Sequence, residues 1–193
     1  MMRIGFFILP NKKLNNEIVN WKKKVKKSIK QSFYLNDPPH LTLYHSKFEN
    51  IDEMINSLKV KISKEEKILI NVYKNDIFFN DPITNCDTLH FCVKRNFKLI
   101  NLQKRLVNII KKYSIIDKNF KFNDSSMNLN YKKFGFPFIG KNWKPHFTIA
   151  SIRYEKISNS FIKNNFRDSF KVDKIHLYEI QNNSHKYICE IKI

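Results

Sequence analysis

The chain has 193 residues, of which 42% are hydrophobic and 14% aromatic, and it carries a formal net charge of +19. These values exclude an intrinsically disordered chain and predict a folded protein with one domain, residues 1–193, divided into two lobes. The positive charge attracts anionic partners such as nucleic acids. Compositional drift explains this charge equally well, because lysine far outnumbers arginine.

Sequence features that bear on location are few. No apolar run approaches the roughly 18 residues that span a bilayer, so we expect no membrane partner. Residues 1–10 lack a small-residue cleavage site and are better interpreted as a first strand than as a signal sequence. The cysteines, Cys86, Cys92 and Cys189, form no C-x-x-C pair, which favours a reducing, cytoplasmic location. We also expect a monomer.

The first half of the sequence predicts strands that alternate with helices. The most extended helix covers residues 12–33, because apolar residues recur there at a spacing near 3.6. Its opposite face is lysine-rich, and Lys22 is predicted to lie on that face in solvent. The other predicted elements are strand 3–9, strand 40–48, helix 51–61 and strands 67–80 and 87–96.

The second half begins with a clear amphipathic helix over residues 97–113. Residues 117–142 show the least regular pattern and predict a loop or hairpin that lines the functional site. The remaining predicted elements are strand 146–152, helix 155–166 and strands 170–181 and 186–192, the last two joined in a hairpin by the turn residues 182–184.

One five-residue motif occurs twice, once in each half of the chain. Residues 39–43 read Pro-His-Leu-Thr-Leu and residues 145–149 read Pro-His-Phe-Thr-Ile, although threonine is rare in this sequence. Both copies alternate polar and apolar residues, which is the pattern of a half-buried strand. In a strand, residues i and i+2 point to the same face, so each copy presents an imidazole and a hydroxyl side by side.

Two such strands suit phosphoryl chemistry. Histidine exchanges a proton near neutral pH, so one ring can take a proton from the attacking oxygen while the other protonates the leaving oxygen. A hydroxyl on each strand can bind the phosphate oxygens as their negative charge grows. This scheme needs no cofactor. The sequence contains no H-E-x-x-H motif or Cys/His cluster, so we predict no metal ligands.

The paired H-x-T motifs resemble the signature of the two-histidine (2H) phosphoesterase superfamily, which includes the LigT-like 2′-5′ RNA ligases, also known as RNA 2′,3′-cyclic phosphodiesterases. The resemblance covers nearly the whole chain and implies an α+β fold. That fold has two pseudo-symmetric lobes, antiparallel sheets around a central cleft and helices on the outside. It also implies metal-independent cleavage, or reversible formation, of 2′-linked or cyclic phosphodiesters. His40 and His146 become the acid–base pair, and Thr42 and Thr148 the phosphate-binding residues.

The substrates implied are RNA ends or small cyclic or 2′-5′-linked nucleotides. Aromatic side chains that stack on their bases are predicted to line the cleft. Tyr44 shares strand parity with Thr42, and the other candidates are Phe138, Trp143 and Tyr178. Core packing is an equally good interpretation of Tyr44.

The remaining histidines are predicted to be structural. His45 falls on the opposite strand parity from His40 and is placed away from the cleft. The others, His90, His176 and His185, lack a threonine partner. The alternative to an enzyme is a non-catalytic RNA-binding module with a basic cleft, which would bind RNA without forming a product.

Overall fold

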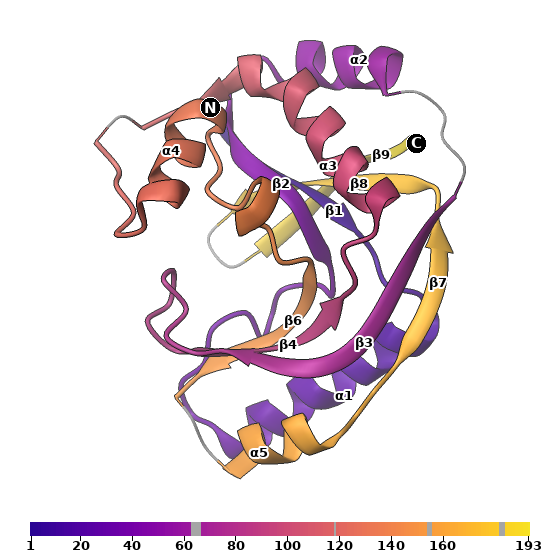
Figure 1. Ribbon diagram of the computed structural model, residues 1–193, viewed down its shortest axis with the longest axis vertical. Helices are drawn as coiled ribbons and strands as arrows, with labels where there is room; N and C mark the ends of the chain where they lie inside the picture. The colour runs from indigo at the N-terminus through magenta and orange to yellow at the C-terminus, as the bar shows by residue number, and fades with distance from the viewer. Residues whose placement is uncertain (63–66, 118, 154–155, 182–183) are drawn as a thin grey trace.

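The protein is described by a computed structural model over residues 1–62, 67–117, 119–153, 156–181 and 184–193 (Figure 1). Its strands form one nine-stranded sheet in the order β7-β3-β4-β6-β2-β1-β8-β9, and β5 pairs with β2. All of the pairings are antiparallel. The strands are β1 (Met2–Ile8), β2 (Leu41–Phe48), β3 (Ile68–Phe78), β4 (Asp87–Val93), β5 (Ser114–Ile115), β6 (His146–Ile152), β7 (Asp168–Val172), β8 (Lys174–Gln181) and β9 (Ser184–Lys192).

The sheet consists of two similar halves. The first half contains β9, β8, β1 and β2, and the second contains β6, β4, β3 and β7. A single residue pair, Leu41 and Phe147, joins β2 to β6 between the halves. The expected α+β fold with antiparallel strands in two halves is confirmed, and the two expected sheets are parts of one continuous, curved sheet (Figure 1).

Helices cover the sheet on the outside. Helix α1 (Lys12–Ser28) packs against β6, and α5 (Lys156–Lys163) packs against β3 and α1. Helix α2 (Ile51–Lys61) packs against α3 (Phe97–Ile110), which contacts β2 and β3. The remaining helical segments are α4 (Ser125–Phe134) and the 3-10 turns Lys111–Tyr113 and Gly140–Asn142. Within the described residues, no helix combines the length and hydrophobicity needed to cross a membrane.

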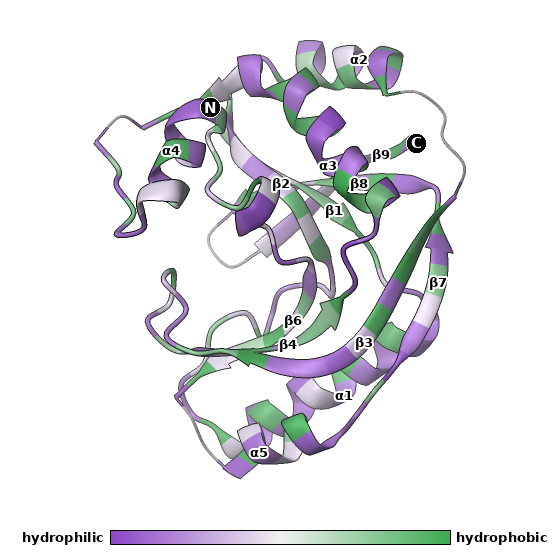
Figure 2. Ribbon diagram, viewed as in Figure 1, coloured by the Kyte–Doolittle hydropathy of each residue, from purple (hydrophilic) through white to green (hydrophobic). Residues whose placement is uncertain are grey.

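The core lies between these helices and the sheet. Hydrophilic and hydrophobic residues alternate along the helices, as expected for one buried face (Figure 2). Leu14, Ile18 and Val25 of α1 are fully buried, as are Leu41 and Phe147 at the junction of the halves. Burial at this junction fixes strand register, because a slip of one residue would move these side chains to the opposite face.

Two long predicted elements are shorter or divided. Helix α1 ends at Ser28, because Ile29 is extended, and Phe33 instead bridges to Ser151. The predicted strand 170–181 is two strands that meet at Asp173: β7 pairs with β3, whereas β8 pairs with β1. Strong sheet curvature allows the chain to pass between distant positions in the strand order over one residue (Figure 1).

The prediction of an irregular segment over residues 117–142 is wrong in its middle, where α4 forms. The Asp124 side chain accepts a hydrogen bond from the main-chain amide of Met127 and caps the helix start. Gly135 ends the helix with a φ of 72°, a left-handed conformation that glycine adopts without strain. The predicted turn at residues 182–184 lies largely outside the described residues.

Candidate active site

The two motif strands meet at the centre of the sheet. Leu41 of β2 pairs with Phe147 of β6 in antiparallel register. This register places position 40 beside position 148, and position 42 beside position 146. Because strand neighbours alternate faces, His40, Thr42, His146 and Thr148 lie on the face opposite the buried pair. All four line one cleft of about 1370 Å³, with each imidazole beside the hydroxyl of the other motif.

Main-chain carbonyl groups orient both imidazoles. His40 Nδ1 lies 2.7 Å from the carbonyl oxygen of Pro38, and His146 Nδ1 lies 2.6 Å from that of Lys144. A carbonyl oxygen only accepts hydrogen bonds, so Nδ1 carries the proton in both rings. The lone pair of each neutral ring therefore resides on Nε2. The two motifs present equivalent proton acceptors.

An aromatic ring supports the first imidazole. The Phe7 ring lies 4.0 Å from the His40 ring between centroids and is inclined to it by 32°. The Tyr178 ring lies 5.9 Å from the Phe7 ring and is not part of the cleft lining. Tyr178 therefore lies next to a residue of the cleft wall and is not itself in that wall, which corrects its prediction as a lining residue. The cause is strand pairing, because Tyr178 lies opposite Gly5 in β8, one strand further from the motif strands than β1.

The second imidazole has a matching support with different chemistry. His90 is the strand partner of Thr148, just as Phe7 is the strand partner of Thr42. The His90 ring lies 5.2 Å from the His146 ring between centroids. Phe78 stacks on His90 at 3.7 Å and lines the cleft. His90 is 1% exposed.

Strand irregularities reverse the parity expected after each threonine. Phe7 pairs with Thr42 and Phe6 with Tyr44, so Leu43 is an extra residue in β2. Tyr44 therefore points into the core, where it is fully buried, and His45 lines the cleft. The prediction that Tyr44 lines the cleft and the placement of His45 away from it are wrong for this one reason, and the alternative of core packing for Tyr44 is confirmed. A register shift at the same position of β6 makes Ile149 the extra residue there.

A buried glutamine supports the irregular part of β2. The Gln103 side-chain amide of α3 donates to the carbonyl oxygens of Leu43 and Phe138, each at 3.0 Å. Gln103 is 1% exposed. These bonds satisfy main-chain groups that the strand ladder leaves unpaired.

Two aromatic predictions agree with the lining of the cleft. Trp143 and Phe138 both line it. Trp143 is 3% exposed, and its indole nitrogen donates to the carbonyl oxygen of Thr42 at 3.0 Å. Trp143 therefore ties the segment before the second motif to the first motif, in addition to forming part of the wall.

The lysine predicted to be in solvent lies under the loop that precedes the first motif. Lys22 is 8% exposed, and its ammonium group donates to the carbonyl oxygens of Tyr34 and Asp37 at 2.5 and 2.8 Å. Burial lowers the pKa of Lys22 to about 8, and Asp37 opposes this shift. Lys22 holds the loop that delivers the Pro38 carbonyl group to His40.

A third histidine stands beside His40. The rings of His40 and His185 are 5.4 Å apart, and His185 lines the cleft. Its Nδ1 is buried without a hydrogen bond, 3.7 Å from a carboxylate oxygen of Asp37. Sequence reasoning missed this residue because it reaches His40 and Asp37 from β9, which is distant from them along the chain. A histidine at a predicted hairpin turn gave no signal of its place in the site.

Burial keeps the cleft histidines neutral. It lowers the pKa of His40 to about 3 and that of His45 to about 4, and it also lowers the pKa of His146. The hydrogen bonds to the Pro38 and Lys144 carbonyl groups oppose the shifts of His40 and His146. Neutral rings are competent proton acceptors.

The cleft lining is mainly basic among its charged residues. Its cations are Arg3, Lys22, Lys47 and Lys144, and its carboxylates are Asp37 and Asp81. A single group in the described part of the chain brings several metal-binding side chains together: Asp76, His90 and Cys92. Sequence spacing did not reveal it, because the three residues come from two strands.

No protein-family profile matches the sequence, and no curated protein matches it. Solved structures do match. Escherichia coli LigT in complex with 3′-AMP has a TM-score of 0.60 and 15% identity, covering 100% of this chain and 97% of LigT. The protein TT0787 of Thermus thermophilus has a TM-score of 0.63 and 13% identity over 99% and 97% of the two chains. A structure described as a phosphoesterase has a TM-score of 0.56 and 13% identity over 100% and 99%.

These matches show that the chain has a fold that is found in phosphoesterases. The particular fold is the LigT-like fold, and the resemblance expected from the paired motifs is confirmed at this level.

Proposed function

We propose that this chain is a two-histidine phosphoesterase that cleaves a 2′,3′-cyclic phosphate or a 2′-5′ phosphodiester without a metal ion. The observation that carries this proposal is the crosswise placement of His40 and His146 beside Thr148 and Thr42. The reaction needs an acid and a base on opposite sides of one phosphorus atom, and two imidazoles with matching tautomers meet that need.

Hydrolysis of a cyclic phosphate proceeds by attack of water on phosphorus. One imidazole Nε2 takes a proton from the attacking water, and the protonated ring of the other motif gives its proton to the leaving 2′ or 3′ oxygen. The P–O bond to the leaving oxygen breaks, and a phosphate monoester with a free hydroxyl forms. The two histidines exchange roles when the reaction runs in reverse.

The substrate helps to set the required protonation states. A phosphodiester carries a negative charge, which raises the pKa of an adjacent imidazole and allows one ring to be protonated near neutral pH. Thr42 and Thr148 donate hydrogen bonds to the non-bridging oxygens, where charge accumulates in the transition state. Lys144 and Lys22 add positive charge to the cleft.

The substrates we propose are RNA ends or small nucleotides. The cleft is far larger than one phosphate group and has aromatic side chains, Phe78, Phe138 and Trp143, in its wall. Such side chains stack on unpaired bases. Structures of LigT with 3′-AMP and with NADP⁺ are among those that resemble this chain. We also propose a cytoplasmic location, because all three cysteines are free thiols.

The test is turnover of 2′,3′-cyclic nucleotides and 2′-5′ oligonucleotides in EDTA. We expect wild-type turnover to be unaffected by the chelator. His40→Ala and His146→Ala should each lose about 10²- to 10⁴-fold in kcat, the usual contribution of general acid–base catalysis. His176→Gln is the matched control, because that ring lies on β8 outside the cleft lining.

Two results would contradict the proposal. Loss of turnover in EDTA would indicate metal-dependent chemistry. RNA binding that weakens with salt but yields no product, and that is indifferent to both alanine substitutions, would identify the chain as a non-catalytic RNA-binding module.

A further inference from the structure

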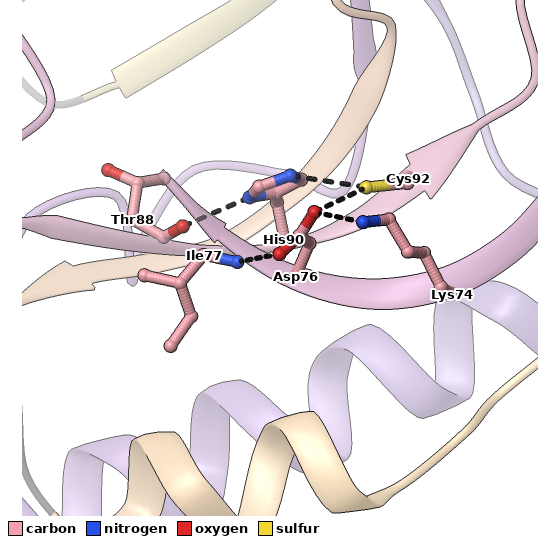
Figure 3. A network of polar contacts seen from close by, with 6 residues as sticks. All are labelled: Lys74, Asp76, Ile77, Thr88, His90 and Cys92. Atoms are coloured by element: carbon pink, nitrogen blue, oxygen red, sulfur yellow. Dashed lines mark hydrogen bonds and ion pairs between the residues drawn. The ribbon is translucent and has the colours of Figure 1, made fainter. Parts of the chain in front are cut away.

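Three metal-binding side chains converge beside the second motif (Figure 3). Asp76 of β3 pairs with His90 of β4, and Cys92 follows two residues later on the same face. The ligand atoms of all three lie within 4.8 Å of one another. Cys92 pairs directly with His146, so this cluster adjoins the proposed active site without including its motif residues.

Two distances within the cluster match those of a tetrahedral metal site. His90 Nε2 lies 3.4 Å from Cys92 Sγ, and Cys92 Sγ lies 3.7 Å from Asp76 Oδ2. Zinc binds sulfur at about 2.3 Å and nitrogen or oxygen at about 2.0 Å, so tetrahedral angles place such ligand atoms about 3.5 Å apart. The two distances from Cys92 Sγ therefore already match the spacing of zinc ligands, and the third lies within 4.8 Å.

Main-chain groups orient two of these ligands. His90 Nδ1 lies 3.0 Å from the carbonyl oxygen of Thr88, so Nδ1 carries the proton and Nε2 offers its lone pair (Figure 3). Asp76 Oδ1 accepts from the amide of Ile77 at 3.0 Å, which leaves Oδ2 facing the thiol. Metal-binding histidines generally donate their second ring nitrogen to a carbonyl or carboxylate in this way.

The fold itself does not require an imidazole at the position of His90. The corresponding pair in the first half of the sheet is Phe7 and His176, where His90 and Asp76 stand in the second half. One half therefore supports its catalytic imidazole with a phenyl ring, and the other supports it with a ligand set. Among the described residues, a group of Cys, His and Asp side chains close enough to share one ion occurs in the second half and not in the first.

A cation already occupies the edge of the cluster. The Lys74 ammonium group lies 2.5 Å from Asp76 Oδ2, and its side chain is 46% exposed. An exposed lysine can move into solvent at little cost, since surface ion pairs contribute about 0–1 kcal/mol. Asp76 is 37% exposed, which gives an ion a path from solvent.

We propose that Asp76, His90 and Cys92 bind a divalent transition-metal ion of the zinc type. The ion replaces the Lys74 ammonium group at Asp76 and the proton of the Cys92 thiol, which passes to solvent. A water molecule completes the tetrahedron. Thiolate and imidazole ligands select zinc or cobalt over magnesium and calcium, which prefer oxygen. This site is additional to the phosphodiester chemistry and does not depend on it.

The experiment is a titration of the reduced, tag-free full chain with Co²⁺, followed by absorption spectroscopy. We expect one equivalent to produce the visible bands of tetrahedral cobalt and a near-ultraviolet sulfur-to-cobalt charge-transfer band, both removed by Zn²⁺. Cys92→Ser should abolish the charge-transfer band and weaken binding by about tenfold or more. Cys189→Ser, a half-buried thiol on β9, is the matched control and should keep both.

Lys74→Met is the variant that separates metal binding from misfolding, because it should tighten Co²⁺ binding by removing the competing ammonium group. The proposal is overturned by an absence of one-equivalent binding, by a charge-transfer band that persists in Cys92→Ser, or by its loss in Cys189→Ser. Unchanged or weaker binding in Lys74→Met also overturns it, because the lysine would then not compete with the ion.

Discussion

The two motif histidines are oriented by carbonyl groups two residues earlier in the chain, and not by carboxylates. The proline between each carbonyl and its imidazole restricts the backbone, so the motif carries part of its own geometry. The repeated motif thus predicts the placement of His40 and His146 in the cleft. His185 and Phe78 reach the cleft from other strands, and no local pattern identifies them.

The neutral, buried histidines make stability depend on pH. Burial and the nearby Arg3 lower the pKa of His45 to about 4, and burial lowers the pKa of His90 to about 3. The unfolded chain takes up protons near pH 6.5, so these groups contribute full stability above that pH and lose it as pH falls toward 4. We expect the urea midpoint to fall between pH 7 and pH 5.

Replacement of His45 by glutamine should reduce this slope by up to about 1.4 kcal/mol per pH unit. Urea unfolding at several pH values measures it, with Lys104→Gln, an exposed residue of α3, as the control. A slope that is the same in His45→Gln and wild type would show that His45 is not held neutral by the fold.

At the scale of elements, the extra residues Leu43 and Ile149 determine which side chains reach the cleft. Strict alternation predicts the faces of His40 and Thr42 correctly and then fails at Tyr44 and His45. Sequence gives little warning of such an irregularity, because its support comes from Gln103 on a distant helix. The ends of helix α4, in contrast, are marked in the sequence by its capping residues Asp124 and Gly135.

The end of α4 offers a test of how this element is fixed beside the cleft. Gly135 has a φ of 72°, and a methyl group added there would lie 2.8 Å from Ser46 Oγ and 3.2 Å from Tyr44 Oη. Gly140 has a φ of 60° but open space around it. Alanine at either position incurs the left-handed cost of about 1–2 kcal/mol, and only Gly135→Ala adds a steric clash.

We therefore expect Gly135→Ala to lower the free energy of unfolding more than Gly140→Ala does. Chemical denaturation of the two variants alongside wild type measures the difference. Equal losses would show that α4 packs against β2 and β5 loosely enough to accept a methyl group.

At the scale of the whole molecule, the single pairing of Leu41 with Phe147 joins two half-sheets and brings both motifs to one point. The repeated motif predicted this symmetry, and the continuity of the sheet follows from pairings that a sequence pattern does not reveal. The net charge is +19, and four of the cations line the cleft. Long-range attraction of anionic substrates is its expected effect, with the selective contacts inside the cleft.

The central claim is that His40 and His146 act as one acid–base unit. Turnover of a 2′,3′-cyclic nucleotide by His40→Ala, His146→Ala and the double variant tests it most directly. Residues that act together are strongly non-additive, so we predict that the double variant is about as slow as the slower single variant. Losses that multiply in the double variant, or a single variant that retains wild-type kcat, would contradict the account.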